Sequence, residues 1–105
     1  MNRIAALEEF VKKDPDDPFP RYGLAMAYRE AGQHDQAQVH FDVLLSQFPD
    51  YIAAYLMAGG NLISLGRSQD AAEVFRRGVE AATRNGDDHA RSELEAALAE
   101  LEESQ

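Results

Sequence analysis

The chain contains no cysteine and no long apolar segment. Without cysteine, none of its 105 residues can form a disulfide, which fits a reducing compartment. No apolar run approaches the roughly 20 residues that a membrane-spanning helix needs. The first residues, Met1 to Glu9, become acidic too early for a secretory signal peptide. Together these absences predict a cytoplasmic protein.

Positive charge is also scarce. Ten lysine and arginine residues stand against nineteen aspartates and glutamates, which gives a formal net charge of −9, and only Lys12 and Lys13 are lysines. Such a chain is repelled by nucleic acids and by anionic membranes, so neither is an expected partner. An acidic, lysine-poor surface is typical of a protein adapted to high salt, where screening weakens self-repulsion. An ordinary acidic protein is the alternative interpretation.

Strand-forming sequence is absent as well. Thr83 is the only threonine, and no alternating apolar–polar run rich in valine and isoleucine occurs. The sequence instead contains an internal repeat with a period of 34 residues, which relates Gly32 to Gly66, Ala37 to Ala71 and Phe41 to Phe75. A fixed period of this length indicates a repeated supersecondary unit.

Each repeat is expected to be a pair of helices, because apolar side chains recur at intervals of three and four residues. The predicted architecture is an all-α stack of six antiparallel helices, with hairpins that turn at Gly32 and Gly66. Asp17, Asp50 and Ser68 are candidate N-caps. The expected helices cover about residues 2–13, 19–31, 35–47, 51–65, 69–84 and 88–103.

A single domain is expected over residues 1–105. The last helix has one apolar stripe and one densely acidic face, as a terminal helix needs when one of its sides meets water. The predicted parts are a lone leading helix (1–14), a first repeat (18–50), a second repeat (51–85) and a capping helix (87–105).

The repeat resembles the tetratricopeptide repeat, whose pattern is W-x2-L-G-x2-Y, then A-x3-F, then P. The matching positions of the first repeat hold Arg21, Leu24, Ala25, Tyr28, Ala37, Phe41 and Pro49. Those of the second hold Tyr55, Ala58, Gly59, Leu62, Ala71, Phe75 and Thr83. Arg21, Ala58 and Thr83 depart from the pattern. The resemblance covers essentially the whole chain and implies a short right-handed α-solenoid with closely packed helices.

No motif for catalysis, for a cofactor or for a metal is visible. The histidines, at 34, 40 and 89, have no second ligand at helical spacing, and no serine lies in a nucleophile elbow. Gly59 and Gly60 lack the strand and the lysine of a phosphate-binding loop, so they predict close helix packing instead. We therefore expect no catalytic residue, no cofactor, no metal and no enzymatic activity.

The resemblance also implies a binding groove. In tetratricopeptide repeat proteins the first helices of successive repeats line a concave groove that holds a peptide. The groove positions transferred by register are Phe19, Tyr22, Met26, Arg29, Leu56, Met57, Gly60 and Ile63. Most of them are apolar and lie off the core positions, so the expected partner is an apolar or aromatic segment of a protein or peptide. The sequence thus predicts a protein–protein interaction module, or scaffold.

Three uses of these groove positions remain open: binding of an outside partner, contact in a homodimer, and packing within the chain itself. A clamp for a C-terminal carboxylate, as in the chaperone-binding branch of the family, is not expected. Tyr22, Met26 and Met57 stand where that clamp has its lysine and asparagines.

Overall fold

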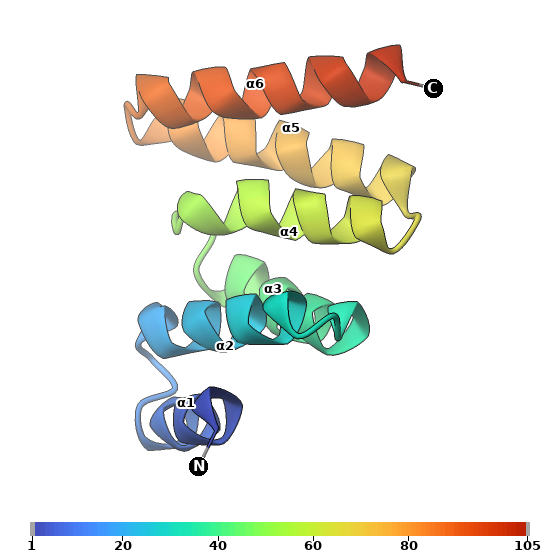
Figure 1. Cartoon of the computed structure of the whole chain (residues 1–105). Coiled ribbons are helices and arrows are strands. Elements are labelled where there is room, and N and C mark those ends of the chain that lie inside the picture. Colours follow the sequence, from blue (N-terminus) through green and yellow to red (C-terminus); the bar gives the residue numbers. More distant parts are fainter. Residues whose placement is uncertain (1, 105) are drawn as a thin grey trace.

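The computed structural model describes residues 2–104, which form six α-helices and no strand. Successive helices are antiparallel and pack in chain order, so the predicted all-α stack is confirmed (Figure 1). The stack is elongated, with extents of 42 × 29 × 19 Å. The helices are α1 (Arg3–Lys13), α2 (Pro18–Glu30), α3 (His34–Gln47), α4 (Ala53–Ser64), α5 (Ser68–Arg84) and α6 (Asp88–Glu103).

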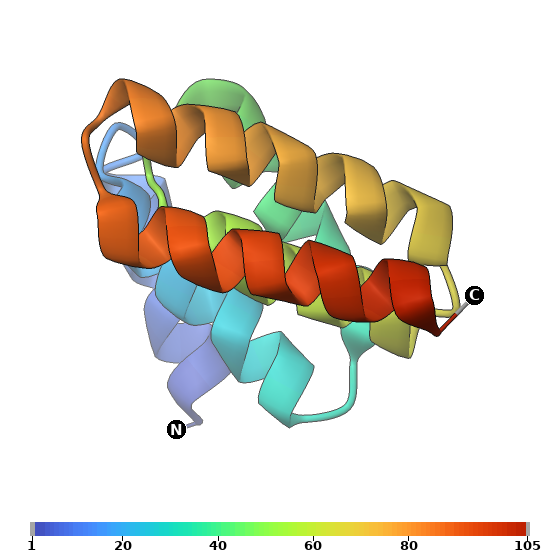
Figure 2. The same cartoon turned by 90° about the horizontal axis from the view of Figure 1, so that it is seen from above.

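The helices form two layers. Helices α2, α4 and α6 lie in one layer, and α3 and α5 lie behind them (Figures 1 and 2). This arrangement follows from the connections, because each turn from α2 onward takes the chain from one layer to the other. The front layer therefore brings together three helices that are separated in sequence. None of the helices between residues 2 and 104 is both long and apolar enough to cross a membrane.

The hairpin turns have the geometry that their glycines predict. Gly32 adopts a φ of 78° and Gly66 a φ of 75°, a left-handed conformation that costs glycine little. After the first turn, the backbone N–H of Gln33 donates to the carbonyl of Tyr28 at 2.9 Å, which satisfies a carbonyl at the end of α2. The second turn repeats this bond from Arg67 to Leu62.

Two of the three predicted N-caps are wrong. Asp17 caps α2 as expected, since its Oδ1 accepts from the N–H of Phe19 at 3.0 Å. Asp50 does not cap α4, which begins after Ile52 without a side-chain cap. Its carboxylate is held instead by Arg84 and Asn85, each at 3.0 Å, and these bonds lower the pKa of Asp50. Ser68 is already the first residue of α5, so it lies one position too late to cap it.

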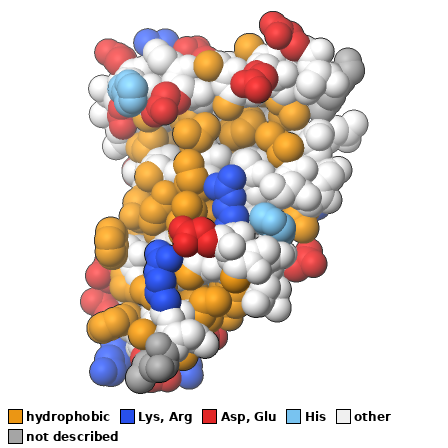
Figure 3. Space-filling model, viewed as in Figure 1, with side chains coloured by type: hydrophobic (Ala, Val, Ile, Leu, Met, Phe, Trp, Pro, Cys, Tyr) orange, Lys and Arg blue, Asp and Glu red, His pale blue; other side chains and the backbone are white. Residues whose placement is uncertain are grey.

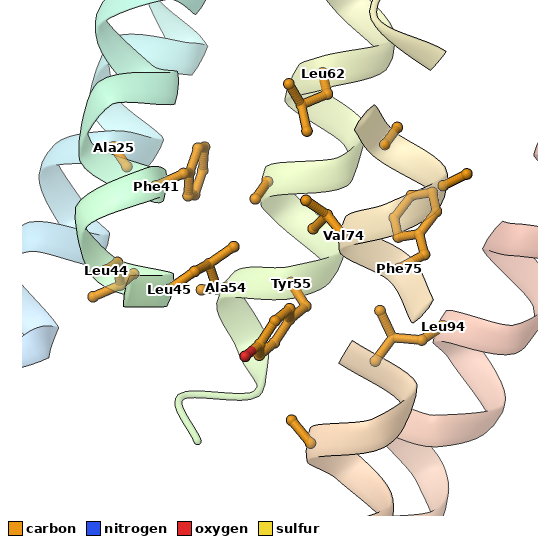
Figure 4. Packing of buried hydrophobic residues seen from close by; sticks show 14 of the residues in the cluster. Ala25, Phe41, Leu44, Leu45, Ala54, Tyr55, Leu62, Val74, Phe75 and Leu94 are labelled. Carbon is orange, nitrogen blue, oxygen red and sulfur yellow. The ribbon is translucent and has the colours of Figure 1, made fainter. Parts of the chain in front are cut away.

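The core lies where α3, α4 and α5 meet. The rings of Phe41 and Phe75, equivalent in the two repeats, are buried within it (Figure 4). Alanines with no exposed surface let the helix backbones approach, as the pattern predicts. Gly59 packs directly on Phe75, because a Cβ atom at position 59 would overlap that ring. The fully buried alanines include Ala25, Ala37, Ala58 and Ala71.

A buried polar cluster joins the two repeats. The side chain of Asn61 in α4 has no exposed surface, and its Nδ2 donates to the carbonyl of His34 and to Oε1 of Gln38. Gln38 in turn donates to Asp42 at 2.8 Å. No buried side-chain polar atom of the described residues lacks a hydrogen-bond partner, so the cluster carries no desolvation penalty from an unpaired group.

Candidate functional site

The layer of α2, α4 and α6 presents one broad apolar face, which we call the α2–α4–α6 face. Hydrophobic side chains gather between α6 and α4 and continue down to α2, while acidic side chains lie along α6 (Figure 3). The predicted groove residues all come from α2 and α4, two of the three helices of this face. The face therefore contains a patch of apolar surface in an otherwise acidic molecule.

The predicted groove residues differ in exposure. Tyr22, Met26, Leu56 and Met57 are half-buried and pack against the core. Phe19 and Ile63 protrude much further, with 70% and 43% of their surface exposed. Half-burial means that the first four side chains are held in place by the core while one side of each remains accessible.

A hollow of about 370 Å³ lies between α4 and α6, and we call it the α4–α6 hollow. It unites three predicted residues, Tyr22, Leu56 and Met57, with a wall from α6. Ile63 lies outside it and lines a smaller hollow of about 250 Å³, with Ala97 and Leu101 among its other residues. The other residues that line the α4–α6 hollow are Ile52, Ala53, Asp87, His89, Ala90, Glu93 and Leu94.

Sequence reasoning missed the contribution of α6 to this hollow, because it treated α6 as a cap. Asp87 caps the helix by accepting from the N–H of Ala90 at 3.0 Å, and this fixes the start of α6 beside α4. Leu94 then anchors the helix on Gly78, where a Cβ atom would come within 3.0 Å of both leucine methyl groups. The apolar spacing that places Ala90 and Leu94 toward the core was the available signal.

Tyr22 forms an aromatic pair at the edge of the hollow. Its ring lies 5.2 Å from that of Tyr51, with the ring planes tilted by 40°. Burial raises the pKa of Tyr22, and the charge of Arg29 lowers it by a smaller amount. Tyr22 therefore contributes a neutral, preordered aromatic surface at physiological pH.

Arg29 crosses from α2 to α4. Its Nη1 lies 3.3 Å from Sδ of Met57, and its Nη2 lies 3.0 Å from the point where a Cβ atom on Gly60 would stand. Gly60 thus leaves room for the guanidinium beside the α4 helix. The three predicted residues Arg29, Met57 and Gly60 are brought together.

A second polar cluster lies away from this face, between α1, α2 and α3. The ring of His40 stacks on Tyr28 with centroids 5.6 Å apart, and Arg21 contacts its Nδ1 at 3.2 Å. Burial, and then the charge of Arg21, lower the pKa of His40. Within residues 2–104, no three histidine or carboxylate side chains are grouped so that they hold a metal ion.

The fold and this face define a class: a short helical-repeat protein with an apolar face on one layer of helices. Models of the tetratricopeptide repeat match residues 28–101 and residues 6–39. The chain belongs to the tetratricopeptide repeat family, as its sequence pattern predicts.

Relatives support this assignment. The chain is 28% identical over 99 residues to a TPR repeat-containing protein of Pseudomonas aeruginosa, covering 94% of each. A tetratricopeptide repeat domain protein of Salinibacter ruber has a similar solution structure, with a TM-score of 0.83, 33% identity and coverage of 88% of this chain and 93% of that one. PcrH, solved with the chaperone binding region of PopD, shares the fold with a TM-score of 0.88 at 15% identity, over 96% of this chain and 77% of PcrH.

Proposed function

We propose that this protein is a protein–protein interaction module whose α2–α4–α6 face binds an apolar or aromatic segment of a partner protein. The α4–α6 hollow is the observation that carries the proposal. Its floor is apolar and partly accessible, and its side chains are held by the core, so little conformational entropy is lost when a ligand enters. Met57 lends the floor adaptability, because a thioether side chain fits varied shapes.

The fold offers a precedent. PcrH, which has this fold, has been solved in complex with the chaperone binding region of PopD. That structure supports a role in which a repeat domain of this size holds a segment of another protein. We propose binding rather than catalysis, since the polar side chains around Asn61 and His40 form their hydrogen bonds with other residues of the fold.

The proposal is tested with random peptides displayed on phage and panned against the purified protein. Selected peptides are then measured by fluorescence anisotropy against the wild type, Leu56→Glu and Ile63→Glu. A carboxylate in the apolar face is costly to desolvate, so both variants are expected to lose at least tenfold in affinity. Val39→Glu is the matched control, because Val39 is apolar and 60% exposed on α3, in the other layer.

Circular dichroism separates binding from folding. Ile63 is already 43% exposed, so Ile63→Glu is expected to melt like the wild type even if Leu56→Glu is destabilised. Failure to select any peptide, or equal affinity for wild type and both folded face variants, would remove the proposed site.

A homodimer that uses the same face is the second candidate. Phe19 favours it, because this large aromatic side chain is 70% exposed beside the predicted groove residues of α2. Sedimentation at a series of concentrations distinguishes the two. A dimer that dissociates in Phe19→Glu supports self-association, whereas a monomer at all concentrations supports an outside partner.

A further inference from the structure

Arg29 lies on the α2–α4–α6 face with most of its hydrogen-bonding capacity unused. A guanidinium group has five N–H donors, and the only acceptor that contacts this one among residues 2–104 is the thioether of Met57, at 3.3 Å. A thioether sulfur is a weak acceptor. The remaining donors of Arg29 are therefore available to a ligand.

Several other arginines of the chain form ion pairs. Arg3, Arg67 and Arg84 each hold a carboxylate oxygen at 2.9–3.1 Å, although all three side chains are at least half exposed. Arg29 is more buried than these, yet no carboxylate among residues 2–104 forms an ion pair with it. Arg21 and Arg77 also form no ion pair among residues 2–104, but Arg21 contacts His40 away from this face and Arg77 is on α5 in the other layer. Within the described part of the chain, Arg29 is therefore the arginine without an ion pair on the α2–α4–α6 face.

Arg29 differs in character from the residue at the equivalent position of the second repeat. The equivalent position 34 residues later holds Ile63, an apolar side chain on the same face. Gly60 makes room for Arg29, because a side chain at position 60 would crowd the guanidinium group. Arg29 and Gly60 together set a cation beside an apolar surface, where low solvent exposure strengthens its attraction for an anion.

Met57 connects this cation to the α4–α6 hollow, since it both contacts Arg29 and lines the hollow. The far rim of the hollow has the opposite charge, with Asp87 at the N-cap of α6 and Glu93 on the helix. His89 lies on that rim, with its Nε2 3.3 Å from a carboxylate oxygen of Glu93. The two ends of the face therefore favour opposite charges in a bound segment.

We propose that Arg29 binds a carboxylate of the partner segment while a neighbouring apolar side chain of the same segment enters the α4–α6 hollow. This inference rests on the proposed function and specifies its partner as an acidic–apolar segment. Arginine and carboxylate form paired, charge-assisted hydrogen bonds, which fix the position of the ligand as well as holding it. The acidic rim on α6 disfavours the reverse placement, with the carboxylate at the α6 end. The carboxylate is that of an aspartate or glutamate side chain, since Tyr22, Met26 and Met57 stand where a clamp for a C-terminal carboxylate has its lysine and asparagines.

The test uses two random peptide libraries, one displayed with a free C-terminus and one with that end joined to the display protein. Wild-type protein is expected to select peptides that carry an acidic group within a few residues of an apolar side chain. Each selected peptide is then synthesised in its acidic form and with that acid replaced by its amide. The acid is expected to bind the wild type roughly tenfold more tightly than the amide, as one charged hydrogen-bonded pair predicts.

Arg29→Gln is the decisive variant, since it keeps most of the aliphatic stem and removes the charge. The tenfold difference between acid and amide is expected to disappear in Arg29→Gln and to be reduced in Arg29→Lys, which keeps the charge but loses the planar fork. Arg3→Gln is the matched control, because Arg3 is engaged with Glu30 on α2 and is expected to leave the difference unchanged.

The outcomes separate the two proposals. If peptides bind but acid and amide bind equally, or if the difference survives in Arg29→Gln, the carboxylate inference is overturned and the binding face stands. If no peptide is selected, the binding face itself fails. Dependence on the acid in the joined library supports a side-chain carboxylate. Dependence that is confined to the free-ended library and lost on C-terminal amidation would overturn the side-chain assignment in favour of a main-chain carboxylate.

Discussion

Asn61 is hydrogen-bonded to both the main chain and the imidazole ring of His34. Its Nδ2 donates to the His34 carbonyl at 3.0 Å, and its Oδ1 lies 2.8 Å from Nδ1 of the same histidine. Because Nδ2 also donates to Gln38, Oδ1 is the acceptor and His34 must carry a proton on Nδ1. The fully buried amide thus fixes the first residue of α3 against α4, which joins the two repeats at the hairpin turn.

Asn61→Ala should destabilise the protein by about 1–3 kcal/mol, because it leaves Oε1 of the buried Gln38, and the carbonyl and ring of the half-buried His34, without the partner that Asn61 provides. Urea unfolding followed by circular dichroism measures this change. Gln36→Ala is the control, since Gln36 is an exposed amide at the start of the same helix α3, and it should stay within about 0.5 kcal/mol of the wild type. Equal stability of the two variants would contradict a structural role for the cluster.

Phe75→Ala should cost about 3–5 kcal/mol, because the ring is 2% exposed and its removal leaves a cavity between α4 and α5. The same loss is expected for Phe41→Ala, its equivalent in the first repeat. Phe10→Ala makes the same chemical change at a side chain that is 57% exposed, and its effect should be small. Chemical denaturation of the three variants compares them directly; a large loss for Phe10→Ala would show that exposure does not decide the cost.

Two glycine-to-alanine changes should have opposite signs. Gly59→Ala places a methyl group into the Phe75 ring, and the overpacking should cost about 1–3 kcal/mol. Gly23→Ala places its methyl 3.4 Å from Leu7, an ordinary contact, so the gain in helix propensity should stabilise by up to about 1 kcal/mol. Thermal melts of both proteins show the sign. A stabilising Gly59→Ala would mean that α4 and α5 are able to separate without loss.

Salt should stabilise the fold. A net charge of −9 repels itself, and the Debye length falls from about 30 Å at 0.01 M to about 3 Å at 1 M salt. The melting temperature is therefore expected to rise by several degrees over this range of NaCl. Glu100→Gln with Glu103→Gln should reduce the rise, because both glutamates are exposed on α6 and are not in the ion pairs of the described residues. A melting temperature that is independent of salt would remove the support for salt adaptation.

The predicted groove positions show that the repeat register predicts which face a side chain lies on but not how exposed it is. A period of 34 residues placed Tyr22 and Leu56 at equivalent positions on α2 and α4, and both lie on one face. Register says nothing of the depth at which a side chain lies, and Phe19 and Tyr22 of the same set differ strongly in exposure. Their difference arises because Tyr22 meets Tyr51 whereas Phe19 lies at the exposed start of α2.

The sequence by itself determined the helices and their order. Apolar spacing, the glycines at 32 and 66 and the 34-residue period are local or periodic signals, and they located the observed helix ends to within two residues. Only the tertiary structure decided which polar side chains meet between segments far apart in the sequence. Asp50 pairs with Arg84, which is 34 residues away, and Asn61 hydrogen-bonds to His34, which is 27 residues away. Arg29 on α2 contacts Met57 on α4. Such pairings depend on how helices from different repeats approach in space, and no spacing along the chain encodes that approach.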